Sequence, residues 1–167
     1  MGVAELSNIC ERRIEKMTNP QFSQLPAFLV ENPGLNSGFM IAHVTAAALA
    51  SENKILCHPA SVDSIPTSTD KEDHVSMGVT SGLKLQQVIK NLKVNFAIEL
   101  LCNSQAIDYR RPHKSSTVLE AVFAKIRKVV PKVKEDRAFY QDINKLVELI
   151  DSRELLDIVE GKIGKLK

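Results

Sequence analysis

Tryptophan is absent from this 167-residue sequence, and only 5% of its residues are aromatic. Proteins that bind single-stranded nucleic acid typically stack bases on aromatic rings, so no such platform is indicated. The net charge is only +2, and Lys and Arg are spread along the chain apart from a modest basic run at 125–134 that is typical of a solvated helix end. We therefore expect no nucleic-acid partner.

Long apolar runs and cysteine patterns are also missing. No uninterrupted apolar segment is long enough to cross a bilayer, and residues 1–17 carry charges throughout, unlike a signal peptide. The three cysteines, Cys10, Cys57 and Cys102, show no C-x-x-C spacing. An odd count without a pattern indicates reduced thiols, so we expect a cytoplasmic protein with no membrane contact.

The usual signatures of catalytic and metal sites are lacking as well. The sequence has no G-x-S-x-G, no glycine loop for phosphate, and no pair of histidines spaced to share a helix face. Cys57 and His58 are neighbours in the chain, so their side chains cannot face each other. We expect no metal site.

Helical periodicity is what the sequence does contain. Apolar residues recur at helical spacing through most of the chain, and no strand-like alternation of any length is found, so we predict an all-α fold. Two irregular segments that contain proline, 18–38 and 57–70, separate long helices that would form part of a helical-bundle core. We treat 1–167 as a single helical region, with helices predicted at 1–17, 39–56, 72–109, 115–130 and 136–151.

Two of these helices indicate that more chain or more subunits are needed to cover them. The 72–109 helix would be roughly 55 Å long, too long for the other elements to cover. Gly78 and Gly82 could admit a close neighbouring helix, or could simply be tolerated. The first helix opens without a cap, and we therefore expect the chain to be part of a longer protein.

Glu52 breaks the apolar pattern of "AAALASENKIL". On a helix it falls on the same face as Ile41, Thr45, Ala48 and Ile55. A buried carboxylate costs several kcal/mol unless it is paired, and proteins keep such groups mostly at functional sites. From the residues alone, Glu52 either belongs to a site, or reaches solvent near the helix end or pairs there with a lysine.

Lys71 is a second unusual residue, because it is a cation predicted to lie in the first turn of a helix. "TDKE" reads as a capping box with Thr69 as N-cap and Glu72 at the third helical position, which places Lys71 in the first turn. The helix dipole disfavours a cation there. Lys71 is either a functional residue or an ordinary surface lysine.

The segment "LNSGFMIAHVTAAALASENKILCHPASVDSIPTSTDKEDHVSMG" (35–78) closely resembles the aromatic amino-acid ammonia-lyase family. The forms "HPASVDSIPTS" and "EDHVSMG" resemble those members that act on L-histidine. Looser likeness in "AIELLCNSQAIDYR" and "DRAFYQDINKLVELI" extends the resemblance over nearly the whole chain.

The resemblance implies the C-terminal part of an enzyme that eliminates ammonia from L-histidine to give trans-urocanate in histidine catabolism. It implies a methylidene-imidazolone prosthetic group made from Ala-Ser-Gly, which this sequence lacks, so we expect the isolated chain to be inactive. It also implies homotetramers whose active sites combine several subunits with the N-terminal part. Glu52 takes the position of an active-site glutamate, and Lys71 stands where many relatives have a substrate-site glutamine.

Two other functions remain open at this point. The chain could be a non-catalytic helical module, derived from a lyase, that only oligomerises. It could also belong to an ammonia-lyase that acts on tyrosine or phenylalanine.

Overall fold

The protein is all-α, as the sequence predicts. The computed structural model describes residues 1–62, 64–76 and 78–166, and these form no strand, only two isolated β-bridges. In chain order the elements are α1 (Gly2–Thr18), α2 (Pro20–Ser23), η1 (Ala27–Leu29), α3 (Met40–Leu56), η2 (Ala60–Val62), α4 (Gly78–Tyr109), α5 (Thr117–Val129), α6 (Tyr140–Asp151) and α7 (Glu154–Ile163). No helix among these residues combines the length and apolar content that a bilayer span requires.

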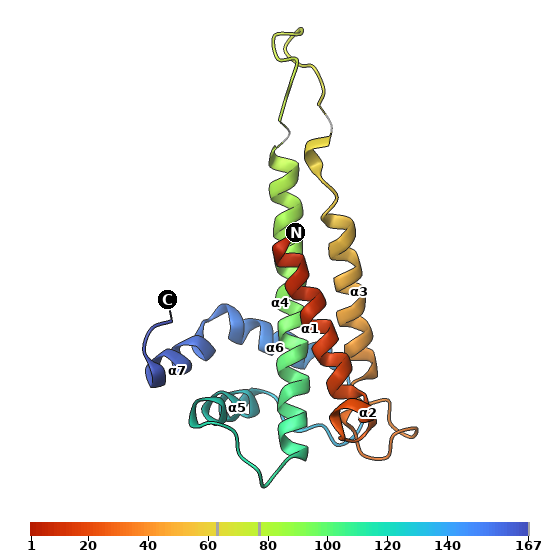
Figure 1. Ribbon diagram of the computed structural model, residues 1–167, viewed down its shortest axis with the longest axis vertical. Helices are drawn as coiled ribbons and strands as arrows, with labels where there is room; N and C mark the ends of the chain where they lie inside the picture. Colours follow the sequence, from red (N-terminus) through yellow and green to blue (C-terminus); the bar gives the residue numbers. More distant parts are fainter. Residues whose placement is uncertain (63, 77, 167) are drawn as a thin grey trace.

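Helix α4 is the axis of the molecule (Figure 1). Its 32 residues give a length of about 48 Å, and α1, α3, α5 and α6 all pack on it. The core lies around its C-terminal half, where Ile98 and Leu101 are fully buried. Its first turns project beyond α1 and leave apolar side chains such as Val79 (78% exposed) and Leu83 (61%) uncovered.

The irregular segment 18–38 packs against the core. Leu29 and Val30 are fully buried. Asp136 closes the segment by accepting hydrogen bonds from the backbone N–H groups of Ser37 and Gly38, both at 2.7 Å. Gly38 has φ +54°, and a Cβ there would lie 2.6 Å from the Phe28 carbonyl oxygen, so only glycine fits.

The long helix starts later than predicted, at Gly78 instead of residue 72. The capping box expected at Thr69 and Glu72 does not form, because Ser68, Thr69 and Asp70 have positive φ and close a turn. Thr67 and Glu72 pair across it through backbone bonds of 2.8 and 3.3 Å. Residues 57–62 and 64–76, which we call the 57–76 loop, are arranged like a hairpin that extends beyond the ends of α3 and α4 (Figure 1).

The boundaries of the later helices also shift. Ser116 caps α5 by accepting a bond from the Leu119 N–H. Helix α6 begins at Tyr140 and not at residue 136. Asp136 and Arg137 are used in tertiary contacts instead, Asp136 with residues 37–38 and Arg137 in an ion pair with Asp142.

Candidate functional site

Helix α3 presents one face to the rest of the chain. That face is made of three small residues and one amide, all of them buried: Ala42, Ala46, Ala50 and Asn53. Small side chains let a helix axis approach its neighbours closely, and α3 packs on both α1 and α4. The sequence did not predict which face of α3 is buried, because this helix carries apolar residues on almost every side.

The face of α3 that carries Glu52 is exposed in the single chain. Ile41 is 58% exposed, Ile55 is 74% exposed, and Glu52 itself is exposed. Burial depends on which face meets α1 and α4, and helical periodicity does not state this. Glu52 is thus a carboxylate at the edge of an uncovered apolar surface.

Glu52 is nevertheless held in place. The Asn91 side chain on α4 donates from Nδ2 to Glu52 Oε2 at 2.8 Å. The same Nδ2 donates to Asn53 Oδ1 at 2.9 Å. One amide of α4 therefore bonds two consecutive residues near the C-terminal end of α3.

Asn91 belongs to a polar stripe on α4 that the sequence reasoning missed. We define this stripe as Gln87, Asn91, Asn95 and Glu99, which recur every four residues. Asn91, Asn95 and Glu99 are all buried, although such groups rarely are unless they are paired. The signal was available, since residues four apart share a helix face.

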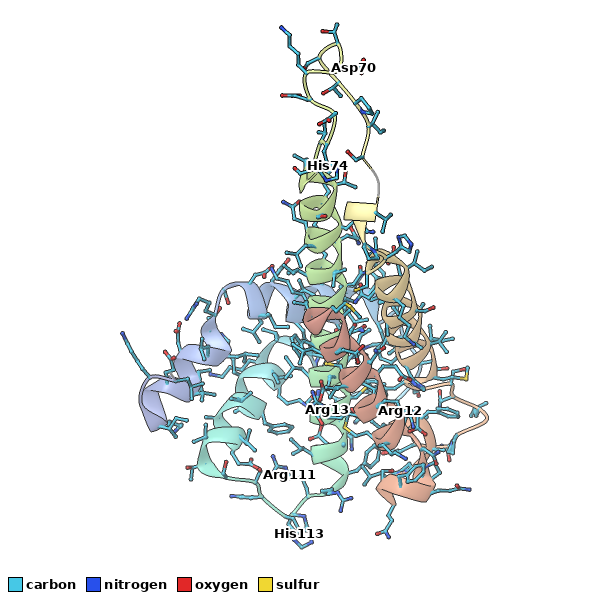
Figure 2. The ribbon with its side chains drawn as sticks, turned by 45° about the horizontal axis from the view of Figure 1, so that its top comes forward. Arg12, Arg13, Asp70, His74, Arg111 and His113 are labelled. Atoms are coloured by element: carbon cyan, nitrogen blue, oxygen red, sulfur yellow. The ribbon has the colours of Figure 1, made fainter. Side chains whose placement is uncertain are left out.

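Lys71 lies away from Glu52. Lys71 is exposed and follows Asp70, which lies at the tip of the loop in Figure 2. Glu52 lies within α3. The helix-start role expected for Glu72 is also wrong, because Glu72 lies in this turn and accepts bonds from Thr67 Oγ1 (2.9 Å) and Ser68 Oγ (3.4 Å). One chain therefore presents Glu52 on a helix and Lys71 with Glu72 on a projecting loop.

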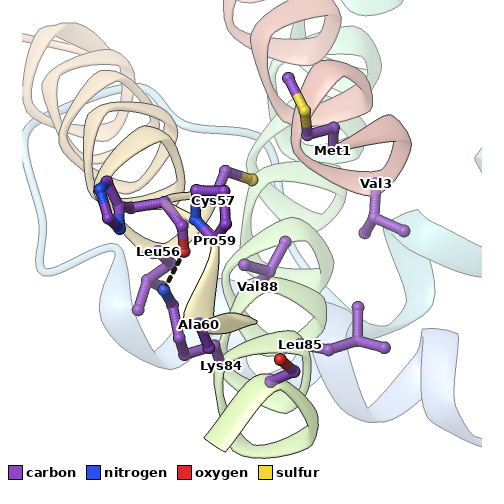
Figure 3. Close-up of a pocket in the computed structure, with 11 residues that line it drawn as sticks. Met1, Val3, Leu56, Cys57, Pro59, Ala60, Lys84, Leu85 and Val88 are labelled. Carbon is purple, nitrogen blue, oxygen red and sulfur yellow. Dashed lines mark hydrogen bonds between the residues drawn. The ribbon is translucent and has the colours of Figure 1, made fainter. Parts of the chain in front are cut away.

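A small open pocket lies where α1, the end of α3 and α4 meet (Figure 3). Its walls combine the apolar side chains of Val3, Leu56, Leu85 and Val88 with polar groups such as Ser81 and Lys84. Lys84 crosses it and donates to the His58 carbonyl oxygen. Neither Glu52 nor Lys71 lines this pocket, so it does not unite the predicted site residues.

Metal ligands are not gathered in the part of the chain that the structure describes. No group of three or more His, Cys, Asp or Glu side chains there is placed to hold an ion. His43 and Glu11 form a pair at 2.9 Å between α3 and α1, and no third ligand joins them. The arrangement around Glu52 can bind a cation or a hydrogen-bond donor, because a carboxylate is an acceptor only.

Comparison with known proteins gives these features a context. Residues 1–128 match the family described as aromatic amino acid lyase. The chain belongs to this family. This match confirms the resemblance of residues 35–78 to the aromatic amino-acid ammonia-lyase family.

Several lyases resemble the chain along its length. It is 53% identical to a histidine ammonia-lyase of Sorangium cellulosum over 99% of its own residues, and 50% identical to one of Symbiobacterium thermophilum over 100%. A crystal structure of histidine ammonia-lyase from Trypanosoma cruzi superimposes with a TM-score of 0.93 at 52% identity, covering 96% of this chain. Tyrosine aminomutase from Streptomyces globisporus superimposes at 0.90 with 33% identity over 99% of this chain.

The chain spans about a third of these relatives. It covers 32% and 33% of the two curated enzymes, and 32% of each of the two solved chains. The helices described above therefore correspond to about a third of the chain of these relatives.

Proposed function

We propose that this chain is part of an ammonia-lyase that eliminates ammonia from L-histidine to give trans-urocanate. The difference in identity supports this substrate. Relatives named histidine ammonia-lyase are 48–53% identical to the chain. The structures of tyrosine aminomutase, phenylalanine aminomutase and ergothionase are 30–34% identical. The three free cysteines support a reducing, cytoplasmic location.

The chain's own residues do not fit the family's methylidene-imidazolone group. No Ala-Ser-Gly occurs in the sequence, and Thr80-Ser81-Gly82, the nearest likeness, lies within α4. Its backbone is committed to helical hydrogen bonds, which a ring-closing turn would have to break. We infer that another segment supplies the electrophile, so the isolated chain has no lyase activity.

Glu52 is the carboxylate that we assign to the substrate. An ionised carboxylate at the edge of an apolar surface can accept a charge-assisted bond from an ammonium or an imidazolium. That bond gains strength when a second protein surface covers Glu52 and excludes water. The exposed apolar residues Ile41, Val44 and Ile55 around it support such a cover by other subunits, as in a homotetramer.

The 57–76 loop supplies two further candidates. We propose that it reaches the substrate site of another subunit and brings Lys71 to its edge. Glu72 is the alternative to Glu52 as the substrate's carboxylate, since it lies in the exposed turn and not in a helix start.

A chimera tests the assignment. This chain would replace the matching third of the Sorangium cellulosum enzyme, and urocanate would be followed by its ultraviolet absorbance. We expect turnover of L-histidine by the chimera and none by the isolated chain. Glu52→Gln and Glu72→Gln are compared in the chimera; a loss of kcat/KM only in Glu72→Gln would move the substrate carboxylate to the loop. Turnover of tyrosine or phenylalanine in preference to histidine would contradict the proposed substrate.

The exposed apolar faces of α3 and α4 also favour a second function, a helical module that only assembles. Both readings predict association, and activity separates them. A chimera that assembles and forms no urocanate would support the module and contradict the lyase.

A further inference from the structure

The turn at the tip of the 57–76 loop has an unusual backbone. Ser68, Thr69 and Asp70 follow one another with φ of +57°, +54° and +62°. Such values are uncommon outside glycine, and strained residues of this kind gather at functional sites. On either side of the turn, the Thr67 N–H donates to the Glu72 carbonyl oxygen at 2.8 Å, and the Glu72 N–H donates to that of Thr67 at 3.3 Å. The turn therefore has a defined register, although it projects beyond α3 and α4 (Figure 1).

The side chain of Glu72 is bonded to the same turn. Residues directly opposite each other in an antiparallel pair have side chains on the same face, so Thr67 and Glu72 can meet. Glu72 Oε2 accepts from Thr67 Oγ1 at 2.9 Å and from Ser68 Oγ at 3.4 Å, and the shorter bond is charge-assisted when the carboxyl is ionised. Glu72 Oε1 accepts no bond from the described residues, so this oxygen is left for a ligand.

Further contacts support the loop below its tip. The Val75 N–H donates to Ser64 Oγ at 3.0 Å, which joins the two arms of the loop. At the base, the Lys84 ammonium on α4 donates to the His58 carbonyl oxygen. The tip is thus connected through the arms to the first turns of α4, and a carboxylate fixed at the tip is also placed relative to the helices.

We propose that Thr67 is a positioning residue for the Glu72 carboxylate, an inference that rests on the lyase function proposed above, with Glu72 instead of Glu52 as the substrate's carboxylate. Glutamate has three side-chain torsions, and on an exposed loop it would otherwise sample several rotamers. The bond from Thr67 Oγ1 commits Oε2 and leaves Oε1 to accept from the cationic substrate in another subunit. The acceptor is therefore preorganised before the loop reaches the substrate.

Thr69 provides a matched control. It is the same residue type in the same turn, and its Oγ1 donates to the Ser68 carbonyl oxygen and not to Glu72. Thr67→Val and Thr69→Val each replace one hydroxyl by a methyl group and keep the branched shape. A general disturbance of the turn would affect both variants alike, whereas only Thr67→Val removes a bond to Glu72.

The experiment is a double-mutant cycle in the chimera described above, with kcat/KM for L-histidine as the readout. We expect Thr67→Val to lower kcat/KM about tenfold or more, as displaced reacting groups do. Thr67→Ser, which keeps the hydroxyl, should restore kcat/KM to within about twofold of the unmutated chimera, and Thr69→Val should stay within the same range. In the Glu72→Gln background, Thr67→Val should cost less than about twofold, because the two residues act as one unit. Thr67→Ala removes the same hydroxyl and serves if valine disturbs assembly.

Each other result decides against a separate part of this scheme. An equal loss from Thr67→Val in both backgrounds, an equal loss in Thr69→Val, or no rescue by Thr67→Ser overturns the positioning role and leaves the proposed function intact. An unchanged kcat/KM in Glu72→Gln overturns Glu72 as the substrate's carboxylate, and the positioning role with it, while the chimera still acts as a lyase. An unmutated chimera without turnover overturns the proposed function itself.

Discussion

Arg13 on α1 and Glu99 on α4 form a two-point ion pair across 86 residues of sequence. Arg13 Nε lies 2.6 Å from Glu99 Oε1, and Nη2 lies 3.1 Å from Oε2. The pair raises the pKa of the Arg13 guanidinium, chiefly through the hydrogen bonds to Glu99. It also joins the first helix of the chain to the buried half of α4.

Arg13→Met should destabilise the chain. Glu99 is only 9% exposed and would be left without its cation, which costs about 1–3 kcal/mol. Arg12→Met is the control, because Arg12 is largely exposed and lies 3.6 Å from Glu15, so its loss should stay within about 0.5 kcal/mol. Urea unfolding of both variants measures the difference. Equal losses would show that the pair contributes nothing beyond a surface contact.

Cysteine reactivity should divide the three thiols. Cys10 and Cys102 are fully buried, while Cys57 is partly exposed. Burial, with the nearby Glu99, raises the pKa of Cys10 from 9.0 to about 12 and raises the pKa of Cys102 as well. Iodoacetamide at pH 8 should label Cys57 alone in the folded chain and all three cysteines in urea, as read by mass spectrometry. Rapid labelling of Cys10 in the native state would contradict the packing of α1 on α4.

The same pKa shifts give a pH dependence with a definite sign. The folded chain binds these thiol protons more tightly than the unfolded chain, so their stabilisation is present below pH 9.0 and is lost as the pH rises toward 12. The free energy of unfolding should therefore fall above pH 9.0, and less steeply in Cys10→Ala. A Cys10→Ala slope equal to that of the unmutated chain would contradict the shift.

Two glycine substitutions should have opposite effects. Gly38→Ala places a Cβ 2.6 Å from backbone and side-chain atoms at a positive φ, and we expect a loss of about 1–3 kcal/mol. Gly82→Ala lies in α4 with nothing within 4 Å, and should stabilise the isolated chain by about 0.5–1 kcal/mol. Thermal unfolding measures both. If Gly82→Ala weakens assembly of the chimera instead, another helix packs at that glycine.

The isolated chain should self-associate through the uncovered face of α3. Ile41→Lys should shift sedimentation toward the monomer, because a charge on that face disfavours its burial. Leu119→Lys on α5 is the control, since Leu119 is 53% exposed, close to the 58% of Ile41. A chain that sediments as a monomer before any substitution would contradict the expectation.

Much of the helical architecture follows from local pattern. The long helix ends at Tyr109 as predicted, Ser116 caps α5, and the proline-containing segment 18–38 packs against the core. Periodicity and caps act over one or two turns, so they can be read from neighbouring residues.

The errors arise where distant residues compete with local signals. The capping box at Thr69 was outcompeted by a turn in which Thr67 and Glu72 pair. Residue 136 did not start a helix, because Asp136 bonds to residues nearly a hundred positions away. No local window contains these partners.

Glu52 shows the division most clearly. By itself, the sequence determined that an all-α chain carries a carboxylate on an apolar helix face and that its residues resemble the lyase family. Only the tertiary structure decided that this face is uncovered in the single chain, and that Asn91 holds the carboxylate from another helix. The reason is physical: helical spacing fixes which residues share a face, whereas packing against α1 and α4 selects which face is buried.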